Sequence, residues 1–350
     1  MIISRKNIKL RTLIALAALC FIISASLVIP DKSTALFEED MRLFKLMEGL
    51  GYEGVDHFPD TDLFGVSAQR GESLIREGFS SRPGGGRTKK QSKHFVCTSC
   101  HNLEKEDPDL ANPDPQDRLV YTEEKGMPFL QGTSLYGAVN RERFYNDDYY
   151  KKYGELVVPA RENIREAIQL CAVECSQGRK LLPWELESIL AYLWTIDLKL
   201  SDLNLSPEEV DYVEKAYRNK TNQDSALIIL QSKYRTDSPA HFTTAYDSKL
   251  ALEKLEGNPE NGQLIYENSC LHCHADRRYS YFLLDNDQLT FKHLSKKALG
   301  YGYHSLIQVT RFGVYSKAGK RSYMPQYPLE KMSNQQLADL HAYIQMKASE

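Results

Sequence analysis

The chain has 350 residues, of which 26% are charged and 42% hydrophobic, and its formal net charge is −3. This composition is typical of a globular protein with two or three domains. The charge balance gives no basic excess that would indicate nucleic-acid binding, so we expect no nucleic acid among the partners.

The first 35 residues have the pattern of an export signal. Four basic residues lie within the first eleven positions, and a mostly apolar run of 17 residues follows from Leu13 to Ile29. Small residues at 33–35 permit cleavage after Ala35. We therefore predict that residues 1–35 are a signal peptide and that the protein is periplasmic. The alternative is an uncleaved anchor in the inner membrane, and only then do we expect membrane contact.

The next segment combines a helical pattern with a cysteine motif. GESLIREG at 71–78 indicates a helix, and FVCTSCH at 95–101 contains Cys97, Cys100 and His101. Cys-x-x-Cys-His is the attachment signal of a c-type haem, in which the cysteines bond the porphyrin and the histidine ligates the iron. A redox dithiol or a zinc site is the alternative for Cys-x-x-Cys, but the following histidine and the export signal favour haem.

Two further cysteines precede a second helical pattern. Cys171 and Cys175 lie in IQLCAVECSQGRKLLPW, directly before LESILAYL at 186–193, whose apolar residues recur on one helical face. Residues 198–257 then carry helix signals of their own: Ser206 is a candidate N-cap and Pro207 occupies the first helical position. This stretch is predicted to be a helical linker.

The same order of patterns then repeats. NGQLIYEN at 261–268 is followed by SCLHCHAD, which contains Cys270, Cys273 and His274, and LADLHAYI at 337–344 repeats the pattern of 186–193. A duplicated order of helix, cysteine motif and closing helix indicates two copies of one structural unit. We therefore predict two covalently bound haem c groups.

The predicted fold is mainly α, with two cytochrome c-like haem domains in tandem, joined by a helical linker and preceded by the export signal. The predicted boundaries are 1–35 for the signal or anchor, 36–197 for the first domain with its large insertion, 198–257 for the linker and 258–350 for the second, class I type domain. Strand signals are sparse, and the best of them, RFGVYS at 311–316, is too short to found a sheet.

Each iron needs a second axial ligand. RSYMPQYP places Met324 ahead of the closing helix, where small c-type cytochromes hold a thioether ligand, and a core-filling role is the alternative. In the first unit, Cys171 lies fifteen residues before Leu186, close to the thirteen that separate Met324 from Leu337. Cys171 is therefore the predicted ligand there, since a thiolate suits haem iron and lowers its potential.

Other readings of the first unit stay open. Cys171 and Cys175 could form a disulfide if the helix unwinds locally, because cysteines four apart on a continuous helix lie near the limit of bridging distance. Met127, in KGMPFLQG, or a histidine could then ligate the iron.

Both units resemble the diheme c-type cytochromes that include thiosulfate dehydrogenase and the diheme subunit of the bacterial sulfur-oxidation complex. The resemblance covers roughly residues 65 to 345 and rests on the two cysteine motifs, IQLCAVECSQGRKLLPWELESILAYLW and Met324. It implies that Cys171 ligates, and acts catalytically at, the first haem, and that the second haem, with His274 and Met324, passes electrons out. The chain departs from the family in Cys175 and in GTSLYGAVNRERFYNDDYY at 132–150.

Three functions follow from these patterns. The first is electron transfer between exported or membrane-bound redox proteins, with a low-potential His/Cys haem and a higher-potential His/Met haem. The second is an oxidoreductase that oxidises thiosulfate or another reduced sulfur anion at the first haem. The third, a diheme peroxidase, is the least supported, because no acid/base residues mark an openable haem position.

Overall fold

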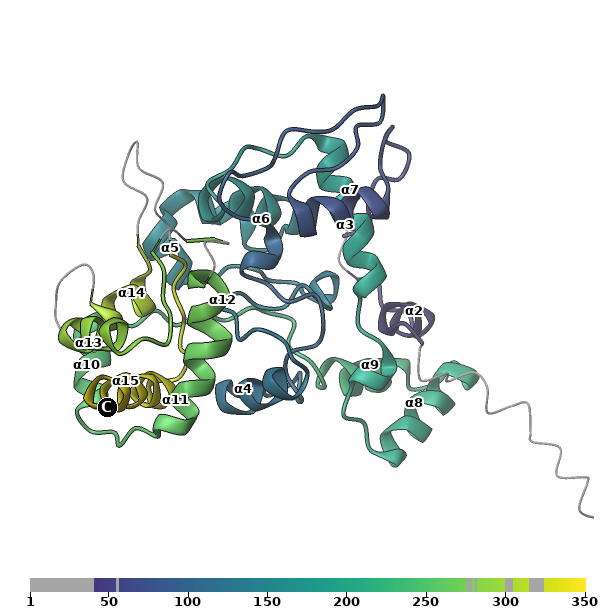
Figure 1. Cartoon of the computed structure of the whole chain (residues 1–350). Helices are drawn as coiled ribbons and strands as arrows, with labels where there is room; N and C mark the ends of the chain where they lie inside the picture. The colour runs from purple at the N-terminus through teal and green to yellow at the C-terminus, as the bar shows by residue number, and fades with distance from the viewer. Residues whose placement is uncertain (1–40, 55–56, 276–278, 281, 300–304, 315–323) are drawn as a thin grey trace, which may run out of the picture. The chain divides into compact units, whose positions relative to one another are not determined.

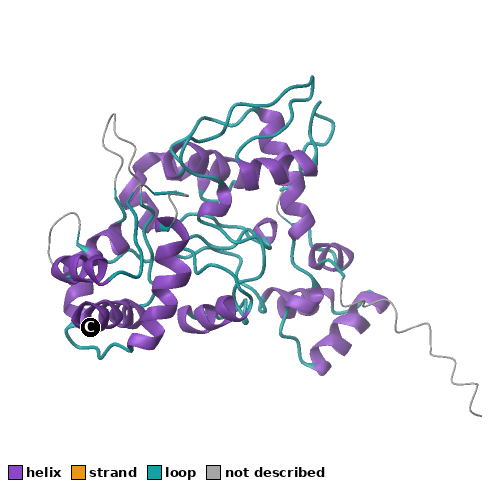
Figure 2. Cartoon of the chain, in the orientation of Figure 1, coloured by secondary structure: helices purple, strands orange, loops and turns teal. Residues whose placement is uncertain are grey.

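The computed structural model describes residues 41–54, 57–275, 279–280, 282–299, 305–314 and 324–350 (Figure 1). The predicted export signal at 1–35 lies outside these residues. Within the described ranges the chain is helices and loops, and strand pairing is limited to isolated bridges such as that between Val314 and Met324 (Figure 2). The mainly α prediction is confirmed. None of the described helices combines the length and the apolar character needed to cross a membrane.

Helices α3 (Ala68–Glu77) and α7 (Pro183–Leu193) form the first packed pair (Figure 1). Their apolar faces meet in a core that includes Leu74, Ile75 and Leu190. A Cβ added at Gly71 would lie 1.9 Å from the backbone oxygen of Ser188, so the two helices approach backbone to backbone at this glycine. Such an approach requires a residue without a side chain.

Helices α11 (Pro259–Ile265) and α15 (Asn334–Ser349) form the second pair, and it repeats the first. A Cβ at Gly262 would lie 2.0 Å from the backbone oxygen of Asp339. Asp339 is two residues past Leu337, as Ser188 is two residues past Leu186. The repeat seen in the sequence is therefore a repeat in helix packing, in the same register.

The remaining helices connect and cover these pairs. They are α2 (Leu43–Gly49), α4 (Pro115–Glu124), α5 (Asp147–Tyr153), α6 (Ile164–Leu170), α8 (Pro207–Asn219), α9 (Gln223–Gln231), α10 (Ala245–Leu252), α12 (Leu271–His274), α13 (Gln288–Lys297) and α14 (Leu306–Phe312). Helices α8, α9 and α10 lie within 198–257, where the sequence predicted helices.

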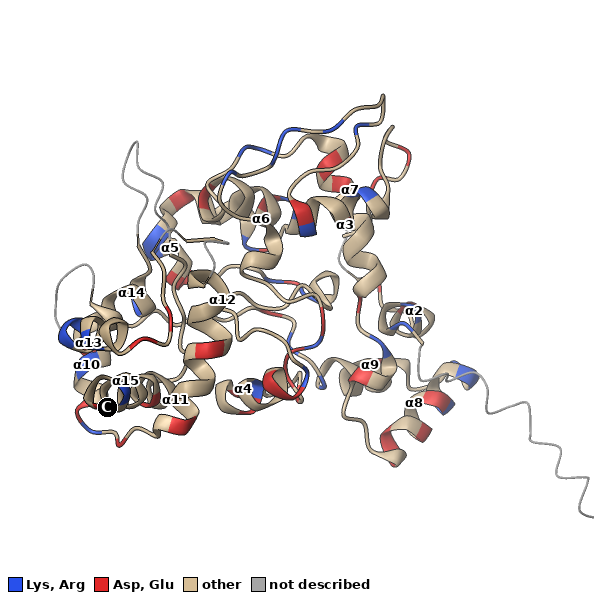
Figure 3. Cartoon of the chain, viewed as in Figure 1, with Lys and Arg blue, Asp and Glu red and all other residues tan. Residues whose placement is uncertain are grey.

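Several helices begin and end with the capping and charged residues that the sequence indicated. The Ser206 hydroxyl accepts from the Glu209 amide at the start of α8, and Ser333 does the same for Gln336 at the start of α15. Acidic residues lie in the first turn of α8 and basic residues in the last turn of α13, which complements the helix dipoles (Figure 3). The strand signal at 311–316 founds no sheet among the described residues: Arg311 and Phe312 end α14, and Val314 forms an isolated bridge with Met324. Residues 315 and 316 lie outside the described ranges.

Candidate functional site: a cavity at the first cysteine motif

A cavity of about 100 Å³ adjoins the first cysteine motif. Its wall brings together segments that are far apart in the sequence. The lining residues are Phe95, Val96, Cys97, Cys100, His101, Gln131, Gly132, Tyr145, Tyr149, Tyr153, Cys171, Cys175, Ser176, Pro325 and Gln326. The structure therefore places Cys171 on the same cavity as the cysteine motif. Met127, the alternative ligand, is buried but is not among these lining residues.

His101 is held in one orientation by the backbone of a neighbouring segment. Its Nδ1–H donates to the carbonyl oxygen of Thr133 at 2.7 Å. This bond leaves Nε2 as the nitrogen available to a metal, and it fixes the plane of the ring. Burial lowers the pKa of His101. The imidazole is therefore neutral, the form that binds a metal.

The segment that carries Thr133 is fixed against the cysteine motif. The Gly132 amide donates to the Cys100 carbonyl oxygen at 2.9 Å. A Cβ at Gly132 would lie 2.6 Å from His101 Nδ1, so only glycine lets this segment lie against the ring. Sequence reasoning missed this support, because Thr133 acts through its backbone and leaves no side-chain signal.

Cys171 and Cys175 lie on one π-helical turn that continues α6. Both line the cavity and both are free thiols. A hydrogen bond between the two sulfurs, together with burial, raises the pKa of Cys171, whereas the same bond lowers the pKa of Cys175 to about 7. The Tyr153 hydroxyl lies 3.7 Å from the Cys175 sulfur. The turn therefore presents two adjacent thiols on the cavity wall, where the sequence had singled out Cys171.

The second cysteine motif shows the same support for its histidine. His274 Nδ1–H donates to the carbonyl oxygen of Phe282 at 2.7 Å, and the Leu284 amide donates to the His274 carbonyl oxygen at 3.0 Å. Burial lowers the pKa of His274. Cys270 packs against the core of the α11 and α15 pair. Both histidines thus present Nε2 with Nδ1 already bonded.

Met324 begins the described segment that precedes α15, and this segment is bonded to α14 and the residues directly after it. Its backbone pairs with that of Val314, and Gly313 approaches its carbonyl oxygen so closely that an added Cβ would lie 1.9 Å away. Arg311, which is 2% exposed, donates to the carbonyl oxygens of Tyr327 at 3.1 Å and Met332 at 2.6 Å. This segment is thereby anchored, and Met324 as a ligand stays a prediction.

The two cysteine motifs lie next to each other. The Cys273 thiol approaches the carbonyl oxygen of Ser99 at 4.0 Å, and the Phe129 amide donates to the carbonyl oxygen of Asn268 at 2.9 Å. Pro325, directly after Met324, lines the first cavity. Groups attached at the two motifs would therefore be neighbours, which no pattern in the sequence indicated.

Comparison with known proteins bears on the segment that contains the second cysteine motif. Residues 257–344 match the family model described as cytochrome C oxidase, cbb3-type, subunit III. This segment is a cytochrome c domain. It implies a covalently bound haem c, and the cytochrome c domain supports electron transfer with redox partner proteins. No curated protein and no solved structure matches the chain.

The residues of this domain fit the group that it implies. Cys270 and Cys273 have the spacing for two thioether bonds, and His274 has a neutral ring with its Nδ1 already engaged. The first motif offers the same donors on the wall of a cavity.

Proposed function

We propose that the chain is an exported diheme c-type cytochrome of the periplasm, with haem c attached at Cys97 and Cys100 as well as at Cys270 and Cys273. The main observation in favour is that both histidines make the same hydrogen bond. Nδ1 of His101 donates to the carbonyl oxygen of Thr133, and Nδ1 of His274 donates to that of Phe282. The duplicated glycine crossing of the helix pairs supports the same conclusion. A c-type haem supplies a one-electron couple, and two neighbouring haems supply a path for electrons through the protein.

The proposed axial ligands are His101 and Cys171 at the first haem and His274 and Met324 at the second. The position of Cys171 on the cavity wall supports the first pair. A thiolate ligand stabilises ferric iron and a thioether stabilises ferrous iron, so the first haem has the lower potential. Electrons then run from the first site to the second and leave to an acceptor protein.

Oxidation of thiosulfate or another reduced sulfur anion at the first site is the proposed substrate chemistry. The second thiol, Cys175, lies beside Cys171, and Lys152 donates to Gln326 on the cavity wall. Burial lowers the pKa of Lys152 to about 8, so near neutral pH its charge can attract an anion. Joining two thiosulfate anions through an S–S bond releases two electrons, one for each haem. The second candidate is an electron carrier without a substrate.

Electron paramagnetic resonance of Cys171→Met tests this proposal. The oxidised wild-type protein should show a low-spin signal of thiolate type beside a His/Met signal. The variant should lose the first signal and keep the second, and thiosulfate turnover should fall at least about a hundredfold, as for loss of a reacting group. Cys175→Ser is the control for the ligand, because it should keep both signals. An unchanged spectrum in Cys171→Met would remove Cys171 as a ligand, and absent turnover in the wild type would leave the carrier function.

A further inference from the structure

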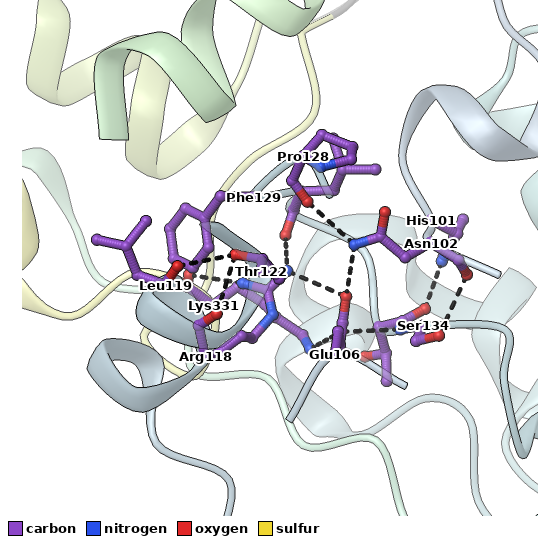
Figure 4. A network of polar contacts seen from close by, with 12 residues as sticks. His101, Asn102, Glu106, Arg118, Leu119, Thr122, Pro128, Phe129, Ser134 and Lys331 are labelled. Carbon is purple, nitrogen blue, oxygen red and sulfur yellow. Dashed lines mark hydrogen bonds and ion pairs between the residues drawn. The ribbon is translucent and has the colours of Figure 1, made fainter. Parts of the chain in front are cut away.

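The buried carboxylate of Glu106 belongs to a polar network next to His101, which includes Asn102 and Ser134 (Figure 4). The side chain of Glu106 is 1% exposed, and every hydrogen-bonding contact it makes is to buried protein groups. Its Oε1 accepts from Lys331 Nζ at 2.7 Å and from the Ser134 amide at 2.9 Å. Its Oε2 accepts from Asn102 Nδ2 at 3.0 Å and from Arg118 Nη2 at 3.3 Å. A buried carboxylate with four donors has one fixed orientation.

Two of these donors belong to the segments that hold His101. Asn102 directly follows His101, and Ser134 directly follows Thr133, whose carbonyl oxygen accepts from His101 Nδ1. Glu106 therefore ties together the residue after the histidine and the residue after its acceptor. The Ser134 hydroxyl closes the connection by donating to the Asn102 carbonyl oxygen at 3.2 Å.

The other two donors are cations, and one of them comes from the cytochrome c domain. Lys331 lies within 257–344, and its side chain is 9% exposed. Arg118, on α4, is 1% exposed and donates to the Lys331 carbonyl oxygen at 3.2 Å. Burial raises the pKa of Glu106, but the charges of these two cations outweigh burial and hold that pKa well below its usual range. The carboxylate is therefore ionised.

Two more charged groups face this cluster. Arg141 donates to the Ser134 carbonyl oxygen at 2.9 Å, and Asp107 is 8% exposed beside Glu106. With Arg118 and Lys331, the cluster holds three cations and two acids. Removal of Glu106 or Lys331 therefore changes the local charge in opposite directions, while the cluster around them stays polar.

We infer that Glu106 and Lys331 are positioning residues for the first haem: Glu106 fixes His101 through Ser134 and Asn102, and Lys331 lets the cytochrome c domain adjust the charge behind that histidine. The inference rests on the proposed function, since it requires haem at the first motif. A negative charge behind a ligating histidine stabilises ferric iron, and a positive charge destabilises it. The potential of the first haem thus depends on the charge of Lys331, a residue of the cytochrome c domain.

The test is a redox titration of the purified holoprotein, followed by the electron paramagnetic resonance signal of the first haem. Glu106→Gln should raise the potential of the first haem, and Lys331→Met should lower it. Each shift should be about 59 mV, which for a one-electron couple is a tenfold change in the ferric-to-ferrous ratio at a given potential. In the double variant the potential of the first haem should return near the wild-type value. Because the double variant removes both charges of the Glu106–Lys331 pair, it also serves if a single variant folds poorly. The second haem should move less than the first.

Glu187→Gln is the matched control. Glu187 is also a shielded carboxylate, 2.7 Å from Arg165 Nε, but its donors are Arg165 and the Asp60 amide, which do not belong to the segments that hold His101. It should leave the first potential unchanged. Shifts of the same sign in both single variants, or no shift in either, would overturn the inference. Intact mass separates this failure from that of the proposed function: wild-type protein carrying one haem overturns both, and two haems with unmoved potentials overturn the inference alone.

Discussion

Replacing Gly262 by alanine should destabilise the protein, although alanine favours helices. An added Cβ would lie 2.0 Å from the backbone oxygen of Asp339, whereas close carbon–oxygen contacts are roughly 3.3 Å. The α11 and α15 backbones would therefore have to separate by roughly 1.3 Å, the difference between these two distances. A gap of about 1 Å already forfeits about half of the dispersion attraction, so this separation would lose at least that share at the crossing.

The magnitude follows from two opposing terms. Overpacking of this kind costs about 3 kcal/mol, and the better helix propensity of alanine returns about 1 kcal/mol. The net loss in the free energy of unfolding should be about 2 kcal/mol, read from urea unfolding followed by far-ultraviolet circular dichroism. Gly71→Ala should behave alike, because its Cβ would lie 1.9 Å from the Ser188 oxygen.

Gly84→Ala is the control, since nothing lies within 4 Å of a Cβ at that position. It should leave the free energy of unfolding within about 0.5 kcal/mol of the wild type. If Gly262→Ala proved as stable as Gly84→Ala, the backbone-to-backbone crossing would be refuted. A loss in Gly262→Ala without one in Gly71→Ala would refute the equivalence of the two helix pairs.

Three further predictions follow from the supports of the two sites. Gly132→Ala, whose Cβ would lie 2.6 Å from His101 Nδ1, should remove the low-spin signal of the first haem and leave the second; an intact first signal would contradict the support. Burial raises the pKa of Glu106, but its cationic neighbours hold that pKa below its usual 4.5. The ionised carboxylate therefore stabilises the fold above pH 4.5, and this stabilisation is lost as the pH falls further. Urea unfolding should therefore show a shallower acid loss in Glu106→Gln than in the wild type. Arg311→Met should leave buried carbonyl oxygens without donors, cost about 3 kcal/mol and abolish the signal of Met324 ligation, whereas a retained signal would show that the segment holds without it.

The helix pairs were predictable because each leaves a local signature. The apolar stripes of 186–193 and 337–344 recur with helical spacing, and Ser206 and Ser333 satisfy amide groups within their own first turns. These features depend on neighbours in the sequence. The mainly α fold and the pairing of motif and closing helix could therefore be predicted without a structure.

The supports of the two sites could not be predicted. Thr133 and Phe282 accept through carbonyl oxygens, which every residue carries, so no residue type marks them. Glu106 and Lys331 are 225 residues apart, and the sequence around each reads as ordinary surface charge. Their burial depends on the close approach of the two motifs, which is a long-range property of the packing.

The strand signal at 311–316, too short to found a sheet, begins inside a helix, because its first two residues end α14. Its β-favouring residues are local, but Arg311 donates to carbonyl oxygens 16 and 21 residues further along. Those bonds require the guanidinium to project from the last turn of α14. The residues that Arg311 bonds lie outside its local sequence, so the local pattern could not indicate them.

The central claim is that both cysteine motifs carry haem, and intact mass tests it most directly. Protein from a host with cytochrome c maturation machinery should exceed the mass of its processed polypeptide by about 1.2 kilodaltons, the mass of two haem groups. Replacing Cys97 and Cys100 together by alanine should halve this excess and spare the group at Cys270 and Cys273. An excess of a single haem that the double substitution leaves unchanged would contradict the account.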